Sequence, residues 1–178
     1  MNSPEQSAIR LERWRRASLS TARFNRNMPA TLQGLGLLDC ELLVRDSQLV
    51  TNQTPFQIDE NPMYLARHLT LSYLWILGAY EIVRSMAQQM RINSKQEIAE
   101  GSTFSMLLRT FERLRIPLAK FEASNRTART DFPIAYPALD PMTGISWEVA
   151  SDVYISRTSL SDELLDYLDR SNTPPEGT

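Results

Sequence analysis

Apolar side chains fill almost every position over residues 69–80. A helix that is apolar on nearly all sides is typical of a central element that its neighbours contact from several directions. Asn61 followed by Pro62 is a favourable helix start, because asparagine caps free backbone N–H groups and proline suits the first helical position. The pattern therefore predicts a central helix over 62–91. Gly78 in its middle lowers helix propensity, so we expect another helix to approach closely there.

The most regular apolar periodicity in the chain indicates a second long helix, and its residues are Phe104, Leu107, Leu108, Phe111, Leu114, Leu118 and Phe121. Spacings of three and four residues place these side chains on one helix face. Ser94 and Glu97 have the spacing of a capping box, which predicts a helix over 95–124. An interruption is expected at Gly101–Ser102. The helix over 95–124 would pair with the helix over 62–91 to form the core.

The remaining elements are shorter. Residues 4–27 predict an N-terminal helix with few apolar positions. Residues 37–52 fit either a helix or a hairpin that turns at Asp46–Ser47, because such short apolar runs do not separate the two. Alternating apolar residues at 145–149 and 153–156 predict a small β-hairpin.

A short helix from Ser161 to Arg170 is expected to end the folded part, followed by a disordered tail over 171–178. These elements define the fold class as mainly α (α+β). We expect a single domain over 1–170, a helical bundle built on two long antiparallel helices with a small β-hairpin near the C-terminus.

The composition is that of a globular protein of 178 residues with a single cysteine, so an intramolecular disulfide cannot form. The N-terminal segment lacks the apolar stretch of a secretory signal, and the longest apolar run is too short to cross a bilayer. Together these features favour a cytoplasmic protein without a membrane contact.

Charge is distributed unevenly along the chain. Residues 1–130 hold seventeen basic and twelve acidic side chains, whereas residues 131–178 hold two basic and nine acidic ones. This asymmetry suggests that the two parts pack on each other, or that the basic part faces nucleic acid. In the first helix, Arg13, Arg16 and Arg23 are candidate nucleic-acid-facing residues. The arginines there spread around the helix rather than forming a stripe, so nucleic-acid binding is possible but not favoured.

Two stretches, YEIVR at 80–84 and FERLR at 111–115, share a Glu and an Arg three residues apart. If the two long helices are antiparallel, these stretches lie at equal height. Glu81 would then pair with Arg109 or Arg113, and Arg84 would pair with Glu112. The candidate polar cluster consists of His68, Tyr80, Glu81, Arg84, Arg109, Glu112 and Arg113.

We assign no catalytic residue, no metal site and no cofactor. One histidine, one cysteine and the lack of metal-ligand spacings argue against a zinc site. Phosphate-binding, dinucleotide-binding and hydrolase motifs are missing from the sequence. We therefore expect a non-enzymatic, self-associating interaction module, a homodimer or the binder of another protein. The alternative is a nucleic-acid- or nucleotide-binding protein, or an enzyme, with a site made of Arg and Glu side chains.

Overall fold

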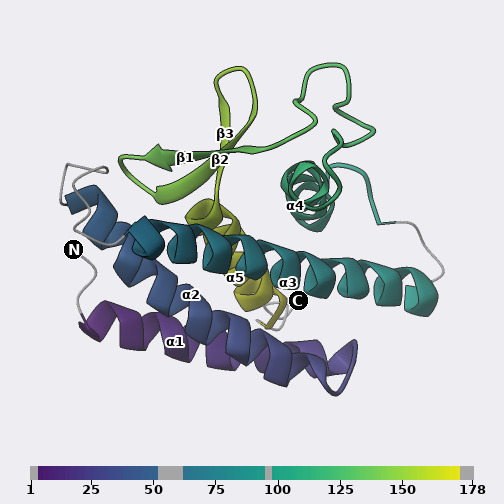
Figure 1. The fold of residues 1–178 in the computed structure, drawn as a ribbon. Helices are drawn as coiled ribbons and strands as arrows, with labels where there is room; N and C mark the ends of the chain where they lie inside the picture. Colours follow the sequence, from purple (N-terminus) through teal and green to yellow (C-terminus); the bar gives the residue numbers. More distant parts are fainter. Residues whose placement is uncertain (1–3, 52–61, 95–97, 173–178) are drawn as a thin grey trace.

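A computed structural model describes residues 4–51, 62–94 and 98–172 (Figure 1). The elements of these residues, in chain order, are α1 (Pro4–Leu19), the 3-10 helix η1 (Ser20–Arg23), α2 (Met28–Thr51), α3 (Pro62–Ser94), α4 (Thr103–Lys120), β1 (Tyr136–Asp140), β2 (Gly144–Ala150), β3 (Val153–Ser156) and α5 (Arg157–Asn172). The protein is mainly helical with a small antiparallel sheet near the C-terminus, as predicted. No helix of this described part is long and apolar enough to cross a membrane.

Residues 37–51 form a helix rather than a hairpin, since α2 runs unbroken through the predicted turn at Asp46. The helix α2 lies beside α1, and Gly36 permits the contact: a Cβ atom there would lie 2.5 Å from the Cβ of Trp14. Trp14 is completely buried. The first helix ends at Leu19, earlier than the predicted Asn27, and η1 follows it.

The central position of α3 agrees with its apolar sequence. Trp75, Ile76 and Val83 are completely buried in it. The close approach expected at Gly78 is made by α2, because a Cβ atom at Gly78 would lie 3.0 Å from Leu35 Cδ2. The Trp75 indole Nε1 also donates to the Leu35 carbonyl oxygen at 3.0 Å.

The helix α4 buries most of its predicted stripe, including Phe104, Phe111 and Leu114, but it ends at Lys120 and leaves Phe121 exposed. Ser102 caps it by accepting a hydrogen bond from the Ser105 amide at 3.2 Å. Figure 1 shows α4 nearly end-on while α3 runs across the view. The two helices therefore cross rather than run alongside each other, so they do not hold their charged stretches at equal heights.

The sheet has three strands in the order β1-β2-β3, all antiparallel. The predicted hairpin corresponds to β2 and β3, and β1 is an addition. Between β1 and β2, Asp140 Oδ1 accepts the Met142 and Thr143 amides at 2.8 Å, which fixes a tight turn. Gly144 follows this turn with a φ of 81°, in the left-handed region that favours glycine.

The helix α5 begins at Arg157, directly after β3, rather than at the predicted Ser161. Ser156 is the capping residue, because its Oγ accepts the Ser159 amide at 3.2 Å. This shift of one turn places Ser161 inside the helix, where its side chain is buried.

Three predictions fall outside the described residues: the capping role of Asn61, the box formed by Ser94 and Glu97, and the tail beyond Asn172.

Candidate functional site

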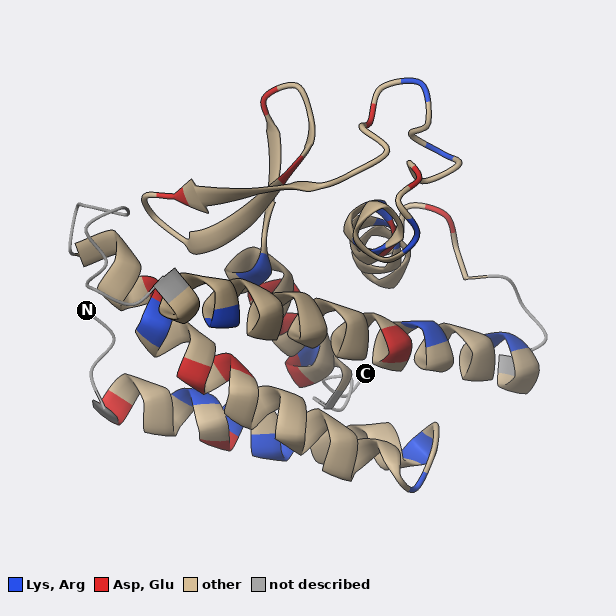
Figure 2. Ribbon diagram, in the orientation of Figure 1, with Lys and Arg blue, Asp and Glu red and all other residues tan. Residues whose placement is uncertain are grey.

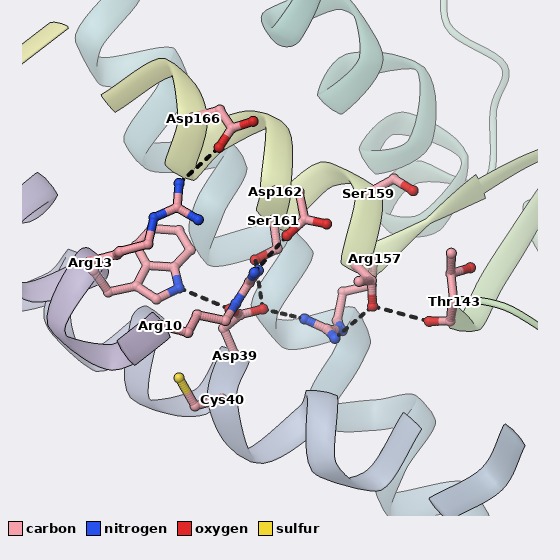
Figure 3. A network of polar contacts seen from close by, with 12 residues as sticks. Arg10, Arg13, Asp39, Cys40, Thr143, Arg157, Ser159, Ser161, Asp162 and Asp166 are labelled. Carbon is pink, nitrogen blue, oxygen red and sulfur yellow. Dashed lines mark hydrogen bonds and ion pairs between the residues drawn. The ribbon is translucent and has the colours of Figure 1, made fainter. Parts of the chain in front are cut away.

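A buried carboxylate on α2, Asp39, joins three helices (Figure 3). Its Oδ1 accepts hydrogen bonds from Arg157 Nη1 and from Ser161 Oγ, each at 2.6 Å. Its Oδ2 accepts from Arg10 Nε at 2.6 Å and from the indole Nε1 of Trp14 at 2.9 Å. Four donors thus converge on one carboxylate that is completely buried.

A second carboxylate, Asp46, lies two turns further along the same helix and is also buried. Its Oδ2 accepts from Arg157 Nη2 at 2.7 Å. Its Oδ1 lies 2.8 Å from His68 Nε2 and accepts the backbone amide of Ile145 at 3.1 Å. Because a carboxylate only accepts, His68 donates through Nε2. Asp46 therefore ties the sheet and α3 to α2.

Arg157 bridges the two carboxylates, and its side chain has no exposed surface. The planar guanidinium offers several donors in a fixed geometry, which suits a residue that must serve two acceptors in the interior. Its centre also lies 5.7 Å from the Trp75 ring. With Arg10 as the second cation, two positive charges balance two negative ones, as burial requires.

The charges of the network lower the pKa of both carboxyl groups. Burial alone would raise the pKa of Asp39, but the nearby charges of Arg157 and Arg10 outweigh it and hold that pKa below its ordinary value. Burial acts in the same way on Asp46, and the hydrogen bond from His68 together with the charge of Arg157 lowers its pKa. Both groups are therefore ionised at neutral pH.

At its outer edge the network continues into ion pairs between α1 and α5. Arg10 Nη1 lies 2.6 Å from Asp162 Oδ1. Arg13 pairs with Asp166 at 2.9 Å and with Asp169 at 2.7 Å. The expectation that the basic part packs on the acidic C-terminal part is confirmed by these contacts (Figure 2).

An open cleft of about 540 Å³ lies above this network. Its lining combines hydroxyl, charged and apolar groups from α1, α2, the β1–β2 turn and α5: Gln6, Ser7, Ile9, Arg10, Arg13, Cys40, Leu43, Asp46, Ser47, Val50, Thr51, Met142, Thr143, Thr158 and Asp162. The volume is in the range of pockets that bind small molecules or inserted side chains. Ile9 and Met142 are 57% and 86% exposed at this cleft.

The single cysteine and the single histidine of the chain, Cys40 and His68, are unreactive or already have a partner. Burial raises the pKa of the Cys40 thiol, so it stays protonated, and Sγ lies 3.7 Å from the Ser7 carbonyl oxygen. His68 is completely buried and has Asp46 as its partner. Among the described residues, no three His, Cys, Asp or Glu side chains gather closely enough to hold a metal ion.

The structure separates the polar cluster predicted from the sequence. His68 belongs to the buried network. Glu81 and Arg84 pair with each other within α3, with Arg84 Nε 2.8 Å from Glu81 Oε2, and both are exposed. The predicted pairs between α3 and α4 are wrong, because Glu81 and Arg84 pair with each other and the two helices cross (Figure 1).

On α4, Arg109 pairs with Glu100 and Arg113 with Asp131, the latter through two hydrogen bonds of 2.7 Å. The ring of Tyr80 has the guanidinium of Arg115 5.1 Å from its centroid. Burial and the nearby charge of Glu112 raise the pKa of Tyr80. Within the predicted cluster, the charges of Glu112, Glu81 and Arg84 all act on Tyr80.

The candidate nucleic-acid-facing arginines have intramolecular contacts. Arg13 is held by the acids of α5 described above. Arg16 Nε lies 3.6 Å from Glu12, and the guanidinium of Arg23 lies 4.8 Å from the ring centroid of Phe24. These arginines do not form one basic surface.

Sequence reasoning missed both carboxylates and Arg157 as site residues. A signal for the carboxylates was present, since Asp39 and Asp46 are seven residues apart and on a helix would share one face with Leu42. No local signal marked Arg157, whose partner Asp39 lies 118 positions earlier.

Comparisons with known proteins add no family: no family model matches the chain, and neither a curated protein nor a solved structure shows significant similarity to it.

Proposed function

We propose that this protein is a non-enzymatic interaction module that self-associates, and that a second copy of the chain binds at the cleft above the buried network. The exposed apolar side chains of Ile9 and Met142 at the cleft carry this proposal. Exposed apolar groups around a concave polar surface are typical of interaction sites, and methionine is enriched in protein interfaces.

The charges of the cleft suit contact with an identical copy. In a two-fold symmetric dimer the same surface meets itself, so each charge must find its opposite within that surface. The cleft has the cation Arg13, which is partly exposed, and the carboxylate Asp162, which is half exposed. A surface of one sign would repel its copy, whereas this one contains both signs.

The network below the cleft supports the same proposal energetically. Side chains of α1, α2 and α5 are fixed by hydrogen bonds to Asp39 before any partner arrives. A surface that is already ordered loses less conformational entropy on binding.

Two sequence features that could indicate a partner, Trp14 on the sparsely apolar first helix and Gly78 on α3, have explanations within one chain. Trp14 is buried and donates to Asp39, and Gly78 accommodates Leu35. The proposal therefore depends on Ile9 and Met142 instead.

Light scattering at micromolar concentrations tests this proposal. We expect the wild-type protein to have twice the mass of one chain. The variant with Ile9→Glu and Met142→Glu should have the mass of one chain, because two carboxylates would be buried in the interface. Met106→Glu is the control, since Met106 is exposed on α4 and does not line the cleft. A wild-type monomer, or an equal effect of the control, would contradict the proposal.

A further inference from the structure

A second cavity, of about 350 Å³, lies at the other end of α3 and shares no lining residue with the cleft. Its lining consists of Arg91, Ile98, Glu100, Ser105, Leu108, Arg109, Glu112 and Arg126. Arginines thus come from three separate segments: the last turn of α3, the second turn of α4 and the loop after α4. Figure 2 shows basic positions at this end of α3 and in that loop.

Within the described residues, two of the three arginines, Arg91 and Arg126, form no ion pair, and both are exposed, while the carboxylates of Glu100 and Glu112 line the same cavity. Arg109 pairs with Glu100, whose side chain is 80% exposed. An ion pair between solvent-exposed side chains contributes little stability, so Glu100 can leave Arg109 at small cost. The cavity therefore offers up to three guanidinium groups to an incoming anion.

Backbone hydrogen bonds hold the loop that carries Arg126. The Thr127 amide donates to the Ser124 carbonyl oxygen at 2.9 Å, and the Asp131 amide donates to the Thr127 carbonyl oxygen at 2.8 Å. Asp131 is in turn held to α4 by Arg113 through two hydrogen bonds. These hydrogen bonds hold the backbone of the turn that contains Arg126.

We propose that this cavity binds the phosphate group of a small phosphorylated molecule. Guanidinium groups match phosphate oxygens in geometry and form strong charge-assisted hydrogen bonds with them. The rest of such a ligand would contact Ile98 and Leu108, and Glu112 would accept a hydrogen bond from its hydroxyl or amino group. A small, half-open pocket with two apolar side chains and an acceptor in its lining favours a small molecule over a nucleic-acid strand, whose backbone follows an extended basic groove.

The test is a calorimetric titration of the full chain with inorganic phosphate, with a nucleoside monophosphate and with a short single-stranded oligonucleotide. We expect the monophosphate to bind more tightly than inorganic phosphate. Arg126→Gln should weaken binding by about tenfold or more, the loss expected for a charge-assisted hydrogen bond. Arg129 lies in the same loop but does not line the cavity, so Arg129→Gln removes the same charge and should leave the affinity for the monophosphate unchanged.

Glu100→Gln should change the affinity for the monophosphate in the opposite direction. It removes the carboxylate that competes for Arg109, so the affinity should rise by about two- to fivefold, within the range of an exposed ion pair. Circular dichroism of each variant checks that the fold is intact. The proposal is overturned if neither phosphate compound binds at millimolar concentration, if Arg126→Gln and Arg129→Gln weaken binding equally, or if the oligonucleotide alone binds.

Discussion

The substitution Asp39→Asn tests the buried network at its centre. The asparagine side chain has nearly the same shape as aspartate but no charge, and one of its two polar atoms is a donor. Arg157, Arg10, Ser161 and Trp14 all donate to this carboxylate. The variant therefore places an amide N–H group against donors. Among the described residues, it leaves the completely buried guanidinium of Arg157 with Asp46 alone as an ion-pair partner.

The expected cost follows from the burial of these groups. Removing one partner of a buried ion pair destabilises a protein by about 3–5 kcal/mol, because the other charge stays in the interior without compensation. In a protein of this size, 1 kcal/mol lowers the melting temperature by roughly 2–4 °C. The variant should thus melt roughly 6–20 °C below the wild type.

Thermal unfolding followed by circular dichroism measures this shift. Glu81→Gln is the control, since it breaks the exposed pair with Arg84 and should change the unfolding free energy by about 1 kcal/mol or less. Melting temperatures for Asp39→Asn and Glu81→Gln that fall by the same small amount would show that the buried charges around Asp39 do not stabilise the fold.

Three further predictions concern stability and reactivity. The pKa values of Asp39 and Asp46 lie below the ordinary 3.8 in the folded state, so the unfolded chain takes up protons first as pH falls. Urea unfolding should therefore show a loss of stability from about pH 5 downward, with a smaller loss in Asp39→Asn; parallel profiles would contradict this. Gly144→Ala should destabilise the protein, because Gly144 has a φ of 81° and a Cβ there would lie 2.5 Å from Asp46 Cβ. Gly34→Ala should instead stabilise the protein by about 1 kcal/mol, because Gly34 lies in α2 and its Cβ would meet open space. Cys40 should react with a thiol reagent more slowly than a free cysteine at pH 8, since its pKa is raised; an equal rate would show that the thiol is accessible and ionised.

Local sequence patterns predicted the elements that are strongly periodic. The helices α3 and α4 and the strands β2 and β3 follow directly from apolar spacing. The strand β1 was missed because Pro137 argues against a strand, yet β1 is an edge strand, where a missing backbone N–H is tolerated. Gly34 and Gly36 obscured α2, whose helical form depends on tertiary packing such as the contact between Gly36 and Trp14.

The candidate site could be predicted only in part, because its contacts are long-range. The sequence identified the basic and acidic parts of the chain and so anticipated that they would pack together. It could not pair Arg157 with Asp39 and Asp46, since that requires the position of α5 relative to α2. The predicted pairs of Glu81 and Arg84 were wrong for the same reason: they assumed parallel axes for two helices that cross.

Hydrogen exchange at two protein concentrations shows whether copies of the chain bind each other at the cleft. Association should slow amide exchange in peptides from the cleft, which include Ile9 on α1 and Met142 and Thr143 in the β1–β2 turn. Exchange in the first turns of α4, around Met106, should be the same at both concentrations. Slower exchange at the cleft alone supports the account. Identical exchange at both concentrations, or protection confined to surfaces away from the cleft, would contradict it.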